Sequence, residues 1–131
     1  DRGWGDLEAP VSSGNVLTID NVPHDWLFPR VAAVVHHGGA GTVAAGLRAG
    51  KPTLVCPVMA DQPFWGQVVH RRGVGPAPIP LAKLTAVRLA SGINELVTDP
   101  AYRERATALG EQIRSEDGVA VAVDILSRIA S

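Results

Sequence analysis

Short apolar runs alternate with helix-like segments along this chain. Three runs are rich in β-branched or other apolar residues, as buried strands typically are, and they cover 16–19, 31–35 and 53–57. A segment with the length of a short helix, 42–49, follows the second run, and a helix is predicted over 61–72 after the third. This alternation predicts an α/β fold with a Rossmann-like parallel sheet and flanking helices.

The remaining segments predict further elements. Residues 1–15 combine Gly, Pro and Ser without periodicity and are expected to form a loop, and Asp25 is expected to cap a short turn. The proline-broken run 74–79 predicts an edge strand. Three helices are expected to complete the chain: 86–97 capped by Thr85, 101–115 opened by Asp99 and Pro100, and 118–130, which is apolar enough to dock on the rest.

Composition and charge narrow the class of protein. The 131 residues are enough for one domain, and 46% hydrophobic with 19% charged residues is ordinary for a soluble globular chain. A net charge of −1 offers no basic surface to nucleic acid. No apolar stretch approaches the ~18 residues that cross a bilayer. The single cysteine, Cys56, is expected in a buried strand, and a cytoplasmic location is expected.

A glycine-rich turn joins the second predicted strand to the helix after it. Its sequence is His-His-Gly-Gly-Ala-Gly-Thr at 36–42. At such a junction the free N–H groups of the helix and the helix dipole favour an anion, and glycine lets the backbone approach a phosphate closely. The pattern predicts a diphosphate site. A tight connection that binds nothing is the alternative.

The junction after the third predicted strand carries a carboxylate and a carboxamide. Asp61 and Gln62 stand directly before Pro63 at the expected start of a helix. Asp61 is also well explained as the N-cap of that helix. Capping and ligand binding use different oxygens, so Asp61 can do both.

Three segments of the chain are similar to one family of enzymes. They are VPHDWLFPRVAAVVHHGGAGT at 22–42, GLRAGKPTLVCPVMADQPFWGQVV at 46–69 and DGVAVAVDIL at 117–126. Together they resemble the carboxyl-terminal, donor-binding half of GT-B-fold glycosyltransferases, in the branch that contains sterol glucosyltransferases and bacterial antibiotic glycosyltransferases. Several motifs occur in the family's order and spacing, which makes the resemblance specific. It implies the incomplete carboxyl-terminal half of a GT-B fold.

The resemblance assigns roles to the glycine turn. His37 matches the histidine that hydrogen-bonds the donor diphosphate. The backbone and hydroxyl groups of the following residues would surround the phosphates: Gly38, Gly39, Ala40, Gly41 and Thr42.

The resemblance also assigns residues to the sugar and the nucleoside. Asp61 and Gln62 match a pair that hydrogen-bonds the sugar hydroxyls, and a carboxylate beside an amide suits a hexose because it offers acceptors and donors together. Val22 matches the position whose main chain pairs with the base, and His24 matches a polar residue near the ribose. No divalent metal and no cofactor is implied, since the donor is a substrate.

Two departures from the family pattern leave the base of the donor open. Asn21 stands where the family often has an aromatic residue that stacks on the base. Ala45 stands where it often has a glutamate on the ribose hydroxyls. Uridine and thymidine diphosphate sugars therefore both stay possible.

The function implied by the resemblance is inverting transfer of a hexose from a UDP- or TDP-sugar to a hydroxyl of a hydrophobic acceptor, such as a sterol or polyketide. In the family the acceptor pocket and the general base lie in an amino-terminal domain. We therefore expect 1–131 to be a single partial domain that holds no catalytic residue and transfers no sugar alone. A bare sheet edge and an apolar interdomain face predict self-association, and any membrane-surface association would belong to the whole enzyme.

Other functions and structural roles are weighed beside this one. A non-catalytic module that binds a nucleotide or nucleotide sugar would use the same turn. A dinucleotide-binding oxidoreductase needs Gly-x-Gly-x-x-Gly, and here Gly39 and Gly41 are followed by no glycine until Gly46, so the spacing fails. His36 and His70 are expected to be structural.

Overall fold

The computed structural model describes residues 14–130, and the predicted loop 1–15 lies almost wholly outside this range. Two short strands and eight helical segments are found in the described part of the chain. In order they are α1 (His24–Leu27), η1 (Phe28–Arg30), β1 (Val34–His36), α2 (Ala40–Arg48), β2 (Thr53–Val55), α3 (Gln62–Arg71), η2 (Leu81–Lys83), α4 (Ala86–Thr98), α5 (Pro100–Ser115) and α6 (Gly118–Ile129).

The two strands form a parallel pair, which confirms the predicted parallel α/β arrangement. Val34 of β1 lies opposite Thr53 of β2, and His36 lies opposite Val55. All three residues of β2 are buried. In β1 only Val34 is buried, while Val35 is 41% exposed, because the described chain covers one face of β1 incompletely. Parallel strands end at the same edge of a sheet, so the loops after β1 and β2 emerge side by side.

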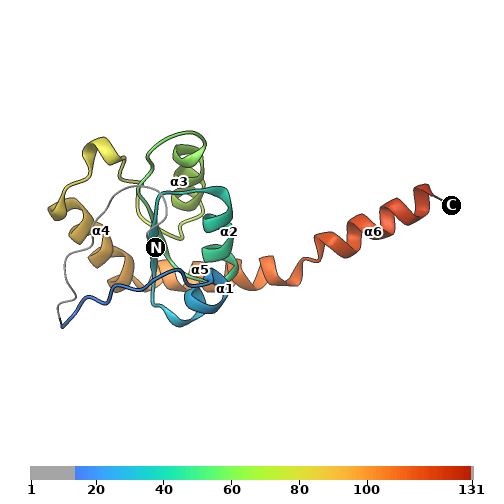
Figure 1. Ribbon diagram of the computed structural model, residues 1–131, viewed down its shortest axis with the longest axis horizontal. Coiled ribbons are helices and arrows are strands. Elements are labelled where there is room, and N and C mark those ends of the chain that lie inside the picture. The colour runs from blue at the N-terminus through green and yellow to red at the C-terminus, as the bar shows by residue number, and fades with distance from the viewer. Residues whose placement is uncertain (1–13, 131) are drawn as a thin grey trace.

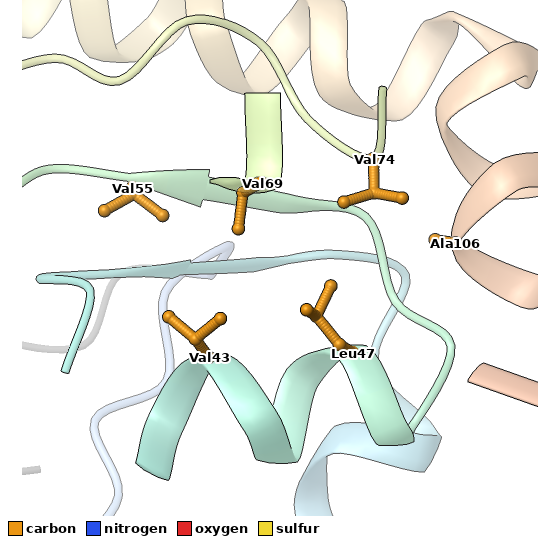
Figure 2. Close-up of a cluster of buried hydrophobic side chains, with 6 residues drawn as sticks. All are labelled: Val43, Leu47, Val55, Val69, Val74 and Ala106. Atoms are coloured by element: carbon orange, nitrogen blue, oxygen red, sulfur yellow. The ribbon is translucent and has the colours of Figure 1, made fainter. Parts of the chain in front are cut away.

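The hydrophobic core lies between the strands, α2, α3 and α5. Figure 2 shows Val43 and Leu47 pointing from α2 toward the strands, and Val55 of β2 and Val69 of α3 pointing back toward them. Ala106 of α5 closes one end of the cluster and is fully buried. The apolar positions of α2 recur every four residues, which is the spacing that puts them on one face. This packing fixes the starts of α2 and α3 against the sheet.

Most helix boundaries confirm the signals in the sequence. The Thr85 hydroxyl accepts a hydrogen bond from the Arg88 N–H at the start of α4, and Asp99 caps α5 by accepting from the Ala101 N–H. Gly50 and Gly73 follow the ends of α2 and α3 with φ of 68° and 65°, a conformation that glycine adopts without strain.

Two predicted strands are wrong. Residues 16–19 form no strand, and Leu17 is 81% exposed because the described chain offers this segment no neighbouring strand. The run 74–79 lies beside β2 and exchanges single bonds with it, from the Thr53 N–H to the Val74 carbonyl and from the Ile79 N–H to the Val55 carbonyl. No ladder forms because prolines within this run lack the N–H donor.

Three smaller predictions also need correction. Helix α1 begins after Pro23, so Asp25 lies inside it and accepts a hydrogen bond from the Trp26 N–H instead of capping its start. Cys56 lies one residue beyond β2 and is only partly buried, and this burial raises the pKa of its thiol. Helix α6 does not dock on the rest, because α5 carries it away from the core (Figure 1) and none of its residues is buried.

Within residues 14–130, no helix is both long and apolar enough to cross a membrane.

Candidate functional site

The two predicted junctions meet at Gly38. This residue has a φ of +96°, and a Cβ atom added to it would lie 2.6 Å from Val55 Cγ1 and 3.1 Å from the Gln62 carbonyl oxygen. The glycine turn after β1 therefore packs directly on the end of β2 and on the start of α3. Only a residue without a side chain permits this approach. The packing brings the glycine turn and the Asp61-Gln62 pair to one edge of the sheet.

The start of α2 is open to solvent and lacks a side-chain cap. Gly39 is the N-cap residue, and its carbonyl accepts from the Val43 N–H at 2.9 Å. The first N–H groups of a helix, here those of Ala40, Gly41 and Thr42, have no acceptor within the helix. A Cβ added to Gly41 would meet nothing within 4 Å. Exposed N–H groups and the positive end of the helix dipole together form an anion-binding surface.

His37 lies beside this helix start. Its side chain is exposed, and its Nε2 atom would be 2.7 Å from a Cβ added to Gly39. An imidazole at this place adds a hydrogen-bond donor to the backbone N–H groups. The turn thus brings together the residues predicted for the diphosphate.

His36 faces the opposite way, into the protein. Its Nδ1 accepts a hydrogen bond from the Gly38 N–H at 2.9 Å. Its Nε2 is buried and has no hydrogen-bond partner among the described residues. Burial, followed by the neighbouring imidazoles of His37 and His24, lowers the pKa of His36 from 6.5 to about 4, so the ring is neutral at pH 7. The prediction of a structural role agrees with this geometry.

The loop between β2 and α3, which is the second junction, is held by a hydrogen-bonding side chain of its own, Gln62. The Gln62 Oε1 atom accepts hydrogen bonds from the Val58 and Met59 N–H groups, at 2.8 and 3.0 Å. Ala60, which follows Met59 in the same loop, has a φ of 56°, the left-handed region that alanine rarely adopts. These bonds use the carboxamide oxygen to hold the loop. The amide nitrogen of Gln62 is the group that can donate to a ligand.

Asp61 is exposed and does not cap α3 with its side chain. Its Oδ2 atom accepts a hydrogen bond from the Trp65 indole N–H at 2.8 Å. The N-cap interpretation of its carboxylate is therefore wrong. The indole fixes the direction of the carboxylate and leaves its second oxygen as an acceptor.

The predicted nucleoside residues lie on the segment before β1. Val22 and His24 are both half-buried. The His24 ring stacks on Phe28, with centroids 4.4 Å apart and 12° between the planes. The charge of His24 acts on His36, so α1 lies within electrostatic reach of the glycine turn.

A cavity of about 500 Å³ lies at the carboxyl-terminal end of α2, the end opposite to the glycine turn, and was not predicted from the sequence. Arg48 near the end of α2 and Arg114 near the end of α5 supply its two cations, and the Arg114 guanidinium donates to the Arg48 carbonyl. These residues are 66 positions apart, so no spacing along the chain points to them. Its other lining residues are Asp25, Pro29, Ala45 and Ala49.

Among residues 14–130, no three His, Cys, Asp or Glu side chains gather in a way that could hold a metal ion. The groups described at the candidate site are backbone N–H groups, one exposed imidazole, one carboxylate and one carboxamide.

This fold and these groups define a Rossmann-like α/β domain with an anion-binding helix start at the carboxyl edge of its sheet. The sequence matches the family described as "Erythromycin biosynthesis protein CIII-like, C-terminal domain" over residues 8–127. The chain belongs to this family, whose members are carboxyl-terminal domains of GT-B glycosyltransferases. The resemblance inferred from its motifs is confirmed.

Sequence relatives come from both expected branches. The chain is 48% identical over 130 residues to a sterol 3-beta-glucosyltransferase of Arabidopsis thaliana, covering 98% of this chain and 21% of the relative. It is 46% identical over 106 residues to the O-mycaminosyltylonolide 6-deoxyallosyltransferase of Streptomyces fradiae, covering 81% of this chain and 25% of the relative. The chain therefore spans about a fifth to a quarter of the length of these relatives.

Two solved structures similar to this chain are also glycosyltransferases. The glycosyltransferase VinC in complex with dTDP superimposes with a TM-score of 0.79 at 29% identity, covering 90% of this chain and 30% of that one. The glycotransferase of kitacinnamycin superimposes with a TM-score of 0.75 at 34% identity, covering 82% of this chain and 28% of that one. Both confirm the predicted fold class.

Proposed function

We propose that this chain binds the diphosphate of a nucleoside diphosphate sugar at the start of α2. The observation that carries the proposal is the contact of Gly38 with Val55 and Gln62, which joins an uncapped helix start to a carboxylate and a carboxamide. The N–H groups after Gly39 and the imidazole of His37 would receive the two phosphates. Stabilisation of a leaving diphosphate by such donors assists bond cleavage as well as binding.

The sugar would lie against the second junction. The free carboxylate oxygen of Asp61 would accept from one hydroxyl, and the amide of Gln62 would donate to a neighbouring one. Both side chains are already held by hydrogen bonds within the chain, so little rotamer freedom is lost when a sugar binds. The base and ribose would lie along the segment of Val22 and His24. One similar structure holds dTDP, and comparison of UDP with dTDP distinguishes uracil from thymine as the base.

The whole protein would transfer a hexose, with inversion, to a hydroxyl of a hydrophobic acceptor. The names of its relatives, a sterol glucosyltransferase and a deoxyallosyltransferase acting on a tylonolide, support this acceptor class. The acceptor pocket and general base would come from the part that the relatives have in addition, so this chain alone would transfer no sugar. A cytoplasmic location, the absence of a metal requirement and self-association remain predictions.

Titration of the ¹⁵N-labelled chain with UDP and dTDP tests the proposal. We expect amide shifts in residues 37–42, loss of binding in His37→Ala, and unchanged binding in His70→Ala, a histidine on the far part of α3. A larger affinity for UDP-glucose than for UDP should disappear in Asp61→Ala. If neither nucleotide shifts the turn, the proposal fails.

Transfer itself is measured on the whole protein that contains this chain, with UDP-glucose and a sterol. Turnover that is lost in His37→Ala supports a glycosyltransferase. Tight nucleotide binding without turnover on any hydrophobic alcohol would favour the non-catalytic binding module instead.

A further inference from the structure

His36 lies directly before His37 at the candidate site, its Nε2 atom is buried, and the proposed function leaves its role open. Its Nδ1 accepts from the Gly38 N–H at 2.9 Å, and a ring nitrogen that accepts from an N–H carries no proton. The proton of the neutral ring is therefore on Nε2, the buried atom that has no acceptor in the described chain. The ring is held in one tautomer by the glycine turn.

An orphaned buried donor has a cost. Leaving an N–H unsatisfied is unfavourable relative to an apolar side chain of the same shape. A leucine at this position would avoid that cost. The presence of a histidine is therefore explained only if its Nδ1 atom makes an interaction that an apolar side chain cannot make. Among residues 14–130, the hydrogen bond from the Gly38 N–H to Nδ1 is the only one that the ring makes.

Gly38 is the residue on which the arrangement of the site depends. Its φ of +96° turns the chain from β1 into α2, and its Cα lies against Val55 and Gln62 with no room for a side chain. The following residue, Gly39, is the N-cap of α2. A change in the Gly38 conformation would therefore redirect the first N–H groups of α2 and separate the two junctions.

We propose that His36 is a positioning residue of the donor site, which through Nδ1 fixes Gly38 and so directs the start of α2 at the diphosphate. This inference rests on the proposed function. The lowered pKa of His36 agrees with it, since protonation of Nδ1 would place two donors face to face and break the bond.

Three variants test this role. His36→Asn places an amide oxygen near the position of Nδ1 and should keep the bond to Gly38. His36→Leu has similar bulk and cannot accept, and His36→Gln carries its amide toward the position of Nε2 instead. His70→Asn is the matched control, because it replaces a histidine outside the candidate site.

Two measurements decide between the variants. We expect the Gly38 amide to exchange with solvent faster in His36→Leu and His36→Gln, and UDP to bind about tenfold more weakly, as the loss of one backbone hydrogen bond implies. His36→Asn and His70→Asn should stay within about threefold of the wild-type affinity. If UDP affinity is kept in His36→Asn but not in His36→Gln, His36 acts through its hydrogen bond to Gly38 and not only by filling space.

Equal UDP affinity in His36→Leu and the wild type would overturn the inference, and so would an asparagine variant as weak as the leucine variant. If His36→Leu does not fold, the comparison of asparagine with glutamine gives the same decision. Failure of the wild-type chain to bind any nucleotide would refute the proposed function, and Gly38 exchange would still decide whether His36 fixes the turn.

Discussion

Two glycines of the same turn should respond in opposite ways to an added methyl group. In Gly41→Ala the methyl group meets nothing within 4 Å. Alanine is favoured over glycine inside a helix by about 1 kcal/mol, and less in its first turn, so the free energy of unfolding should stay the same or rise by a few tenths to about 1 kcal/mol. The Cβ of a helical residue tilts toward the N-terminus, which is where the diphosphate would lie. UDP affinity should therefore fall, by about tenfold or more.

In Gly38→Ala both the backbone and the space are unfavourable. The φ of +96° costs an L-residue about 1–2 kcal/mol, and a methyl group 2.6 Å from Val55 Cγ1 and 3.1 Å from the Gln62 carbonyl adds about 1–3 kcal/mol of overpacking. The free energy of unfolding should fall by about 2–5 kcal/mol. Nucleotide binding should be lost as well, because the two junctions separate.

Urea unfolding followed by circular dichroism measures the stability of both variants, and titration with UDP measures affinity. If Gly41→Ala is destabilised as much as Gly38→Ala, the space described around Gly41 is wrong. If Gly41→Ala is stable and binds UDP with wild-type affinity, no phosphate lies at the start of α2. The pair thus separates an error in the fold from an error in the function.

The remaining predictions concern pH, capping and assembly. The pKa of His36 is lowered in the folded chain from 6.5 to about 4, so the neutral ring contributes to the free energy of unfolding in full above pH 6.5. About 3 kcal/mol of this free energy is lost as the pH falls through about 4. If the free energy of unfolding of His36→Asn falls with pH as steeply as that of the wild type, this prediction is contradicted. Thr85→Ala should lower the free energy of unfolding by about 1 kcal/mol in urea titrations, whereas Thr85→Ser should not, because serine keeps the cap. The apolar side chains of α6, such as Ile125 and Ile129 at 51% and 77% exposure, should drive self-association of the chain, and a light-scattering mass of one chain at high concentration would refute that.

The sequence determined those features that depend on neighbours along the chain. Thr85 and Asp99 cap helices because a side-chain oxygen reaches an N–H two or three residues away, and Gly50 ends α2 because a positive φ needs no distant partner. The order of β1, α2, β2 and α3 followed from the same local patterns. The glycine turn and the Asp61-Gln62 pair were visible for this reason too.

Local sequence patterns did not predict the structure where a segment needs a packing or hydrogen-bonding partner that is distant in the chain. Strand formation at 16–19 was wrong, since an extended apolar run becomes a strand only when another strand offers its N–H and C=O groups. Docking of α6 was wrong because an apolar face becomes buried only when a complementary surface lies against it, and the described chain provides none.

Tertiary structure alone decided how the candidate site is assembled. It packed Gly38 against Val55 and Gln62, and it buried the His36 Nε2 atom while leaving the His37 side chain exposed. These results depend on how the loops after β1 and β2 lie against each other at the edge of the sheet, which neither loop determines alone. The Asp61 carboxylate accepts from Trp65, only four residues away, so that contact is local, and the preference of Asp for N-cap positions did not reveal it. Sequence determines which groups are available, and packing determines which of them face each other.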